Sequence, residues 1–179
     1  MTTTTTYRHL DPTQARAAIG TLKPVYAATF SEPPYNEGPE MAEKFVSWVN
    51  DESTRDGFTM WVAYQAAEPV GFSYGYTMPA GEWFRRTDRP APPEIKAAPK
   101  FAVMEWAVRP DRRRQGVGGQ LMRHLLRDRP EPWAVLTVNP AAAAHDIYRQ
   151  AGWRQIAATK PSRDWPAMAV MVLNLSGVS

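Results

Sequence analysis

The sequence contains no cysteine, which excludes disulfide bonds and thiol chemistry. It also lacks any apolar run that approaches the length of a membrane span. The three histidines, His9, His124 and His145, stand far apart without metal-ligand spacing, so we predict no metal site. The N-terminal run Thr2–Thr6 has neither the positive start nor the apolar centre of a signal peptide, and we expect a cytoplasmic location.

What the chain does contain is typical of an ordinary globular protein. Of its 179 residues, 44% are apolar and 22% are charged. This length predicts one domain over residues 1–179, large enough to bury a real core. The formal charge of +3 is modest, and the arginines gather at Arg112–Arg114. A small anionic ligand therefore explains the positive charge better than nucleic acid does, and we expect no nucleic-acid or membrane partner.

The most informative segment runs from Arg112 to Leu121 and joins three arginines to the glycines Gly116, Gly118 and Gly119. An apolar, β-compatible run precedes it over residues 101–108, and apolar residues recur at helical spacing after it, as far as residue 126. The first amides of a helix lack partners and attract anions, and glycines let a phosphate approach them. The segment thus predicts a phosphate-binding turn between a strand and a helix.

Two common phosphate motifs do not fit this turn. A P-loop requires Lys-Ser or Lys-Thr after its last glycine, whereas Gly119 is followed by Gln120. A dinucleotide-binding fingerprint requires a third glycine where Leu121 stands. What remains is the pattern Arg-x-x-Gly-x-Gly from Arg113 to Gly118.

This pattern resembles the acetyl-CoA-binding motif of the GNAT family of N-acetyltransferases. A second segment, Ala144–Trp153, is similar to the family's other signature, with an alanine four residues before Tyr148. The resemblance covers roughly residues 101–158. It implies an α/β (α+β) fold with a mixed, mainly antiparallel sheet flanked by helices, in which the fourth and fifth strands splay. It also implies transfer of an acetyl group from acetyl-CoA to an amine, without a metal.

The rest of the chain matches that fold by its order of elements. We expect helices over 13–28, interrupted at Gly20 and Pro24, over 39–50, from Val117 to 126 and over 141–151, the last ended by Gly152. We expect strands over residues 7–10, 58–65, 70–77, 101–108, 133–138, 153–158 and 168–175, with a hairpin turn over 66–69. Segment 79–100, rich in proline, is expected to be a loop without regular structure.

The resemblance assigns coenzyme contacts to both signatures. Backbone groups of the fourth strand would pair with pantetheine and face the thioester oxygen, and the glycine turn would hold the phosphates. The family's second signature often has an asparagine seven residues before the tyrosine, and Ala141 occupies that position here. Asn139, two residues earlier, either takes over this contact or only caps the following helix. The expected coenzyme-binding residues are Trp106, Ala107, Val108, Arg113, Arg114, Gln115, Gly116, Val117, Gly118, Gly119, Asn139, Ala144 and Tyr148.

The same resemblance proposes two catalytic residues. Tyr148 would be the general acid that protonates the departing thiolate, unless it only packs on the sheet. Glu105 is the carboxylate in the fourth strand, but many family members have an acidic residue one position earlier, where Met104 stands. A bulge could turn Glu105 into the site as general base, or Glu105 could face away and pair with an arginine. The loop residues Glu32 and Glu37 are alternatives.

The resemblance also implies that the loop between the first two helices and the loops after the third and sixth strands border the acceptor, and these loops carry carboxylates and aromatic rings suited to an amine. The candidates are Glu32, Tyr35, Glu37, Trp83 and Trp165, with Asp88 nearby in sequence to Trp83. We expect a primary amine of a small molecule, because the long aromatic loop could cover the site. A protein N-terminal or lysine acetyltransferase, and a non-catalytic acyl-CoA-binding module, remain alternatives, as does a longer acyl donor. The family suggests a homodimer.

Overall fold

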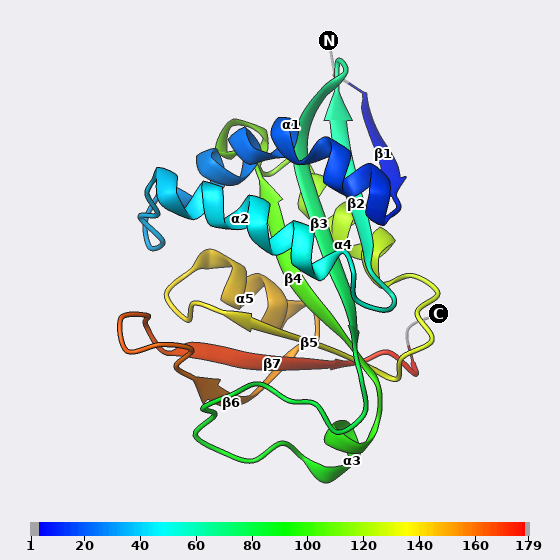
Figure 1. The fold of residues 1–179 in the computed structure, drawn as a ribbon, viewed down its shortest axis with the longest axis vertical. Coiled ribbons are helices and arrows are strands. Elements are labelled where there is room, and N and C mark those ends of the chain that lie inside the picture. Colours follow the sequence, from blue (N-terminus) through cyan, green and yellow to red (C-terminus); the bar gives the residue numbers. More distant parts are fainter. Residues whose placement is uncertain (1–3, 178–179) are drawn as a thin grey trace. The chain divides into compact units, whose positions relative to one another are not determined.

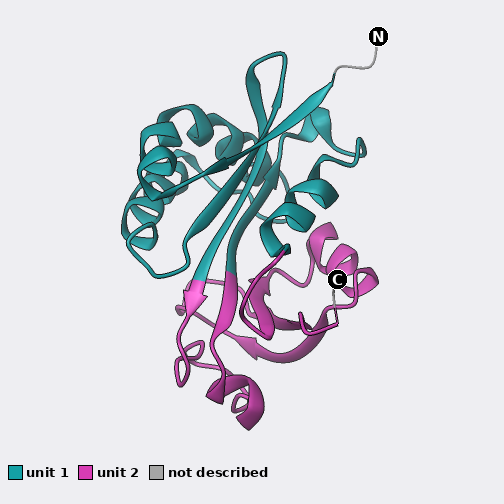
Figure 2. Ribbon diagram, turned by 90° about the vertical axis from the view of Figure 1, so that its right-hand side faces the viewer, with its two compact units in different colours: residues 1–76, 103–127 teal, residues 77–102, 128–179 magenta. Residues whose placement is uncertain are grey.

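The computed structural model describes residues 4–177 and divides the chain into two compact units. Unit 1 comprises the described part of residues 1–76 together with residues 103–127, and unit 2 comprises residues 77–102 with the described part of 128–179 (Figure 2). Each unit combines two separate stretches of chain, and the single domain over residues 1–179 stays a prediction. Thr2 and Thr3 of the N-terminal threonine run lie outside the described residues.

Seven strands follow the hydrogen-bonded order β1-β2-β3-β4-β5-β7-β6 (Figure 1). The strands are β1 (Thr5–Leu10), β2 (Thr59–Gln65), β3 (Glu68–Met78), β4 (Lys100–Val108), β5 (Trp133–Val138), β6 (Arg154–Thr159) and β7 (Met168–Asn174). The helices are α1 (Pro12–Phe30), α2 (Pro39–Glu52), α3 (Pro93–Ala97), the 3-10 turn η1 (Pro110–Arg112), α4 (Val117–Leu126) and α5 (Ala143–Gln150).

The pairing confirms the predicted mixed, mainly antiparallel sheet. The pairs β1–β2, β2–β3, β5–β7 and β6–β7 are antiparallel, whereas β4 and β5 are parallel. The parallel pairing covers only Lys100–Ala102 of β4 and Trp133–Val135 of β5. The splaying of these two strands stays a prediction.

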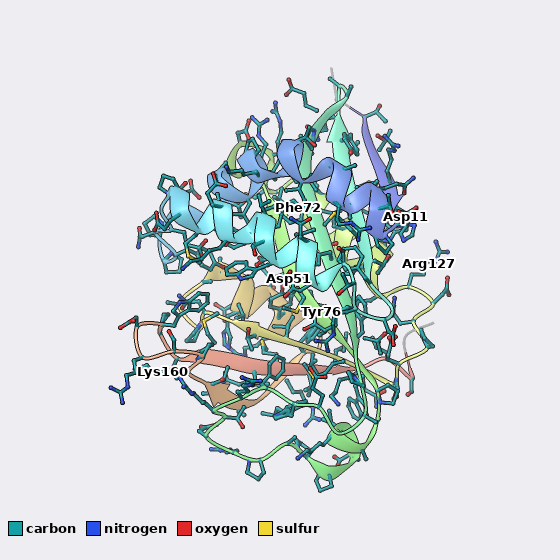
Figure 3. The ribbon with its side chains drawn as sticks, viewed as in Figure 1. Asp11, Asp51, Phe72, Tyr76, Arg127 and Lys160 are labelled. Atoms are coloured by element: carbon teal, nitrogen blue, oxygen red, sulfur yellow. The ribbon has the colours of Figure 1, made fainter. Side chains whose placement is uncertain are left out.

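In unit 1, α1 begins at a capping box and continues further than the sequence suggested. Asp11, at the start of the helix (Figure 3), accepts a hydrogen bond from the Gln14 amide at 2.8 Å, and the Gln14 side chain accepts one from the Asp11 amide at 3.0 Å. The predicted interruption at Gly20 and Pro24 was wrong, because the helix runs through both. A buried apolar face, which includes Leu22, outweighs the one hydrogen bond that proline removes.

Helices α1 and α2 lie side by side against one face of the strands of unit 1 (Figure 1). The Tyr26 and Phe45 rings stack with centroids 4.6 Å apart. Phe45 packs in turn on Phe72 of β3, with centroids 5.3 Å apart; Phe72 is labelled in Figure 3. On the other face, Ser73 of β3 donates to the Leu121 carbonyl of α4 at 3.4 Å. Neighbouring residues of β3 thus face different helices, as strand alternation requires.

In unit 2, β5 pairs with β7 along its whole length, and β7 pairs in turn with β6. The inner residues Val135, Val170 and Val172 are fully buried and form its core. Gly152, with φ of +92°, follows α5 in the left-handed conformation that was predicted to end this helix.

The proline-rich segment is more ordered than predicted. It contains α3, and Thr87 forms a bridge with Thr159 of β6. The fully buried Lys100 organises its end, because the ammonium donates to the carbonyls of Pro79 (3.2 Å), Ala98 (3.0 Å) and Lys96 (3.4 Å). Composition alone could not reveal these tertiary contacts. The hairpin turn is likewise shorter than predicted, with only residues 66 and 67 between β2 and β3.

Candidate active site

The glycine turn places open backbone amides at the start of α4. Gly116 is the N-cap, with φ of +78°, and no side chain caps the helix. Gln120 donates to the Gly116 carbonyl at 3.1 Å, so the amides of Val117, Gly118 and Gly119 before it have no carbonyl partner within the helix. A Cβ atom added at Gly119 would meet nothing within 4 Å. The strand, glycine turn and helix follow in the predicted order, and phosphate binding at these amides stays a prediction.

Trp106 explains why glycine is needed at a second position of the turn. Its indole Nε1 donates to the Gly118 carbonyl at 2.9 Å, and a Cβ added to Gly118 would lie 2.8 Å from the Trp106 Cζ2 atom. Trp106 and Val108 of β4 pack with the buried Val117 of α4. The turn is also braced by Gln115, whose side-chain Oε1 accepts a hydrogen bond from Nε2 of the Gln65 side chain at 3.1 Å. Close packing of β4 on α4, in addition to any ligand, therefore requires Gly118.

The arginines of the turn differ in their contacts. Arg114 is exposed and makes no ion pair within residues 4–177. Arg113 is engaged: its Nη1 pairs with Glu32 Oε2 at 2.8 Å, while Nε and Nη2 donate to the carbonyls of Val108 (3.3 Å) and Thr29 (3.4 Å). An arginine predicted for the coenzyme and a glutamate predicted for the acceptor are thus partners in one ion pair.

Glu105 lies on the face of β4 that is turned away from α4. Its neighbour Trp106 contacts Gly118 of α4, so alternation directs Glu105 to the opposite side, towards α1 and α2, and Met104 to the side of Trp106. Among the described residues, Glu105 makes no hydrogen bond and no ion pair with an arginine. Of the two orientations considered from the sequence, pairing with an arginine is the one that the structure does not show.

Five ionisable groups of unit 1 interact electrostatically with this carboxyl: Tyr26, Tyr35, Tyr74, Glu37 and Glu52. Burial raises the pKa of Glu105 well above its usual range, and the charges of Glu37 and Glu52 raise it further. Burial and then the Glu105 charge raise the pKa of Tyr26 and of Tyr35. The Glu105 side chain keeps some solvent exposure while many protein atoms lie around it.

The two flanking carboxylates are each held by a phenol. Tyr26 Oη donates to Glu37 Oε2 at 2.6 Å, and Tyr74 Oη donates to Glu52 Oε2 at 2.7 Å. Burial raises the pKa of Glu37, and it raises that of Glu52 to about 7. Glu105, by contrast, has no donor of its own, so its carboxyl is the one that a ligand's proton can reach without breaking a hydrogen bond. A carboxyl with a raised pKa is suited to general-base work near neutral pH.

The predicted residues of the second signature lie in unit 2. Tyr148 is 7% exposed, with its ring 5.5 Å from that of Trp153, and its carbonyl accepts from the Trp153 amide at 3.0 Å. Asn139 does not cap α5, because the N-cap is Ala142. Instead the Asn139 side chain accepts from the Ala141 amide at 2.9 Å and holds the turn before the helix. Ala144 lies in the first turn of α5.

The loop aromatics of unit 2 occupy different settings. Trp83 is partly buried, packs edge-on to Phe84 at 5.3 Å and lies 5.9 Å from the Lys100 ammonium. Its indole Nε1 is buried without a hydrogen-bond partner. Trp165 is 38% exposed. Asp88 fixes the loop to β6, since its side chain accepts from the Ala158 amide at 2.8 Å.

Comparison with known proteins identifies the family. Residues 56–155 match the profile described as "Acetyltransferase (GNAT) domain", which is more than half of the chain. The chain belongs to the GNAT family of acetyltransferases. It is an acetyl-CoA-dependent N-acetyltransferase, and the predicted family and fold are both confirmed. No curated protein matches the chain in sequence.

Solved structures of GNAT proteins share the fold at low sequence identity. A GNAT-family protein from Desulfovibrio desulfuricans is 15% identical with a TM-score of 0.70, covering 97% of this chain and 100% of its own. The PaiA N-acetyltransferase from Thermoplasma acidophilum, in complex with coenzyme A, is 11% identical with a TM-score of 0.61, and the match covers 96% of this chain and 99% of its own. The ribosomal-protein-S18-alanine N-acetyltransferase from Escherichia coli is 17% identical with a TM-score of 0.63, and the match covers 98% of this chain and 97% of its own.

Several residues near Glu105 were missed by sequence reasoning. Tyr26 belongs to an amphipathic helix and Tyr74 to an apolar strand, so both were indistinguishable from core residues. Glu52 ends α2, where a carboxylate has no distinctive signal. Only the packing of α1, α2, β3 and β4 in unit 1 brings them towards one carboxyl.

None of the helices described over residues 4–177 combines the length and the apolar character that a membrane span requires.

Proposed function

We propose that this GNAT enzyme transfers the acetyl group of acetyl-CoA to a primary amine of a small molecule, by direct attack in a ternary complex. Glu105 is the general base and Tyr148 the general acid. The observation that carries the proposal is the Glu105 carboxyl. It has no hydrogen-bond donor among residues 4–177, its pKa is raised by burial, and it belongs to the same unit as the glycine turn. That combination supports catalysis over passive binding of the coenzyme.

The donor side would be held by the first signature. The open amides of Val117 to Gly119, together with Arg113 and Arg114, would bind the phosphates, and backbone groups of residues 106–108 would pair with pantetheine. Ala144, Asn139 and Tyr148 would complete the coenzyme site. When bound, acetyl-CoA supplies the thioester that is attacked. The solved PaiA enzyme, which holds coenzyme A on the same fold, supports this assignment.

The chemistry then requires two proton transfers. Glu105 takes a proton from the acceptor nitrogen as the C–N bond forms, which the raised pKa of its carboxyl favours. Tyr148 gives its phenolic proton to the sulfur as the C–S bond breaks, and regains a proton from solvent. A backbone amide of β4 near Trp106 or Val108 would stabilise the oxyanion between these steps.

The acceptor is assigned to an amine because of the charges that surround Glu105. Glu37 and the aromatic ring of Tyr35 belong to the loop between α1 and α2. Burial raises the pKa of Glu37 because it disfavours the ionised carboxylate, and a nearby cation would offset that cost. Glu32, Trp83 and Trp165 are the further acceptor residues that we propose. The 79–100 segment, which carries Trp83, is ordered and braced by Lys100.

The test is thiol release from acetyl-CoA with a panel of small amines and N-terminal or lysine peptides. We compare the unaltered enzyme with Glu105→Gln and Tyr148→Phe. Each variant should lower kcat by about 10²- to 10⁴-fold with little change in coenzyme affinity, which is the usual contribution of a proton-transfer group. Glu105→Gln should also remove the acidic limb of the pH–rate profile, because activity rises as the base loses its proton.

The other outcomes discriminate among the alternatives. Turnover with peptides but not with small amines would establish a protein acetyltransferase, the class to which the ribosomal-protein-S18-alanine N-acetyltransferase belongs by its name. Coenzyme-dependent thermal stabilisation without thiol release would establish a binding module. Unchanged kcat in either variant would remove that residue from the mechanism. The homodimer and the cytoplasmic location stay predictions, the former testable by light scattering.

A further inference from the structure

Arg113 of the coenzyme motif and Glu32 of the α1–α2 loop form an ion pair within unit 1. Nη1 of Arg113 lies 2.8 Å from Glu32 Oε2, and the two side chains are 43% and 46% exposed. The pair joins residues 81 positions apart in sequence. One partner was expected to bind the donor and the other the acceptor, so this contact links the two halves of the reaction.

Arg113 does not need Glu32 to keep its place. Its Nε donates to the Val108 carbonyl at 3.3 Å and its Nη2 to the Thr29 carbonyl at 3.4 Å, which fixes the guanidinium between the end of β4 and the end of α1. Glu32 takes only the Nη1 edge. Nη1 is the nitrogen that meets a carboxylate, whereas Nε and Nη2 meet neutral backbone carbonyls. At Nη1 an incoming phosphate would therefore compete with another anion for the arginine charge.

Glu32 is also tied to the rest of its loop. Its carbonyl accepts hydrogen bonds from the amides of Tyr35 and Asn36, both at 3.1 Å. The Tyr35 ring packs edge-on against Phe30 with centroids 5.0 Å apart, and the Glu37 amide donates to the Phe30 carbonyl at 2.9 Å. A displacement of Glu32 would therefore be passed to Tyr35, whose pKa responds to Glu105.

We propose that Glu32 and a coenzyme phosphate compete for the Arg113 guanidinium, so that donor binding releases Glu32 and repositions the loop that carries Tyr35 and Glu37. Glu32 is then a positioning residue. It acts on the donor site through Arg113 and on the acceptor side through its own loop. The inference rests on the coenzyme role proposed above for Arg113.

The test is the dissociation constant of acetyl-CoA, measured by calorimetry at low and high salt. Glu32→Gln should tighten binding by about two- to five-fold at low salt, the range expected from an exposed ion pair, and the gain should shrink at high salt. A structural role for Glu32 would give the opposite sign, because loss of a structural contact weakens binding. Glu94→Gln is the matched control, since Glu94 is exposed and has no ion pair within the described residues; it should leave affinity unchanged.

A double substitution separates competition from general repulsion. In an Arg113→Ala background, Glu32→Gln should have no effect on coenzyme affinity if the two groups compete for the guanidinium. A gain of the same size in that background would mean that Glu32 only repels the phosphates, and this would overturn the inference. Equal or weaker binding by the single Glu32→Gln variant would also overturn it. If the unaltered protein bound no acetyl-CoA, the proposed role of Arg113 would fail as well.

Discussion

Glu52 should destabilise the folded protein at neutral and alkaline pH, and Glu52→Gln should relieve that cost. Glu52 is the last residue of α2, and its carboxylate accepts a hydrogen bond from Tyr74 Oη at 2.7 Å. Burial, as the largest cause, raises its pKa from 4.5 to about 7, although the Tyr74 hydrogen bond and Arg55 act in the opposite direction. A glutamine can accept the same hydrogen bond through Oε1 without carrying the charge.

The magnitude follows from the pKa difference. At about 1.4 kcal/mol per pH unit, ionising Glu52 in the folded state costs about 3 kcal/mol more than in the unfolded chain. The folded-state pKa lies above the unfolded value, so between pH 4.5 and about 7 the folded protein binds more protons. The Glu52 contribution to stability therefore falls as pH rises through this window. Glu52→Gln should gain up to about 3 kcal/mol at pH 8 and almost nothing at pH 4.5.

Urea denaturation at several values between pH 4.5 and 8 measures this difference directly. Asp51→Asn, an exposed neighbour on the same helix (Figure 3), is the control and should change stability by less than about 0.5 kcal/mol. Because the Glu52 charge raises the pKa of Glu105, the variant should also move the acidic limb of the kcat/KM profile to lower pH. A pH-independent effect, or loss of stability at pH 8, would refute the reasoning.

Two other substitutions test the packing around the site. Gly118→Ala should cost about 1–3 kcal/mol, because its Cβ would lie 2.8 Å from Trp106, whereas Gly119→Ala, which meets nothing within 4 Å, should be neutral or stabilising by up to about 1 kcal/mol in urea denaturation. Lys100→Met should cost about 1–3 kcal/mol, because it leaves three backbone carbonyls without their donor; the exposed Lys96→Met is the control, and equal stability of both variants would contradict this role.

The glycine turn before α4 could be predicted because local sequence encodes its backbone geometry. Gly116 adopts a positive φ and caps α4 without a side chain, as the glycine spacing indicated. The strand limits of β5, Trp133–Val138, were also predicted correctly. In each case a few neighbouring residues suffice to set the conformation, so one stretch of sequence contains the whole signal.

Longer-range contacts escaped prediction for the opposite reason. Pro24 and Gly20 are helix-breaking residues locally, yet the buried face of α1 keeps the helix continuous. Prolines made the 79–100 segment look irregular, yet Lys100, at its end, ties it together through backbone carbonyls. A buried ammonium with several acceptors leaves no pattern in the sequence, because its partners are main-chain atoms that every residue possesses.

The proposed general base depends on the second kind of information. The Glu105 pKa is raised by burial and by Glu37 and Glu52, which come from a loop and a helix end far away in sequence. The register difference at Met104 made Glu105 uncertain from the sequence, but alternation in β4 gives it the face opposite to Trp106, away from α4. In the proposed mechanism, Glu105 therefore acts from the α1 and α2 side of β4, which a residue at position 104 would not face. The pH–rate profile of the Glu52 variant, recorded where both proteins are folded, therefore tests the proposed base through its surroundings and complements the removal of Glu105 itself.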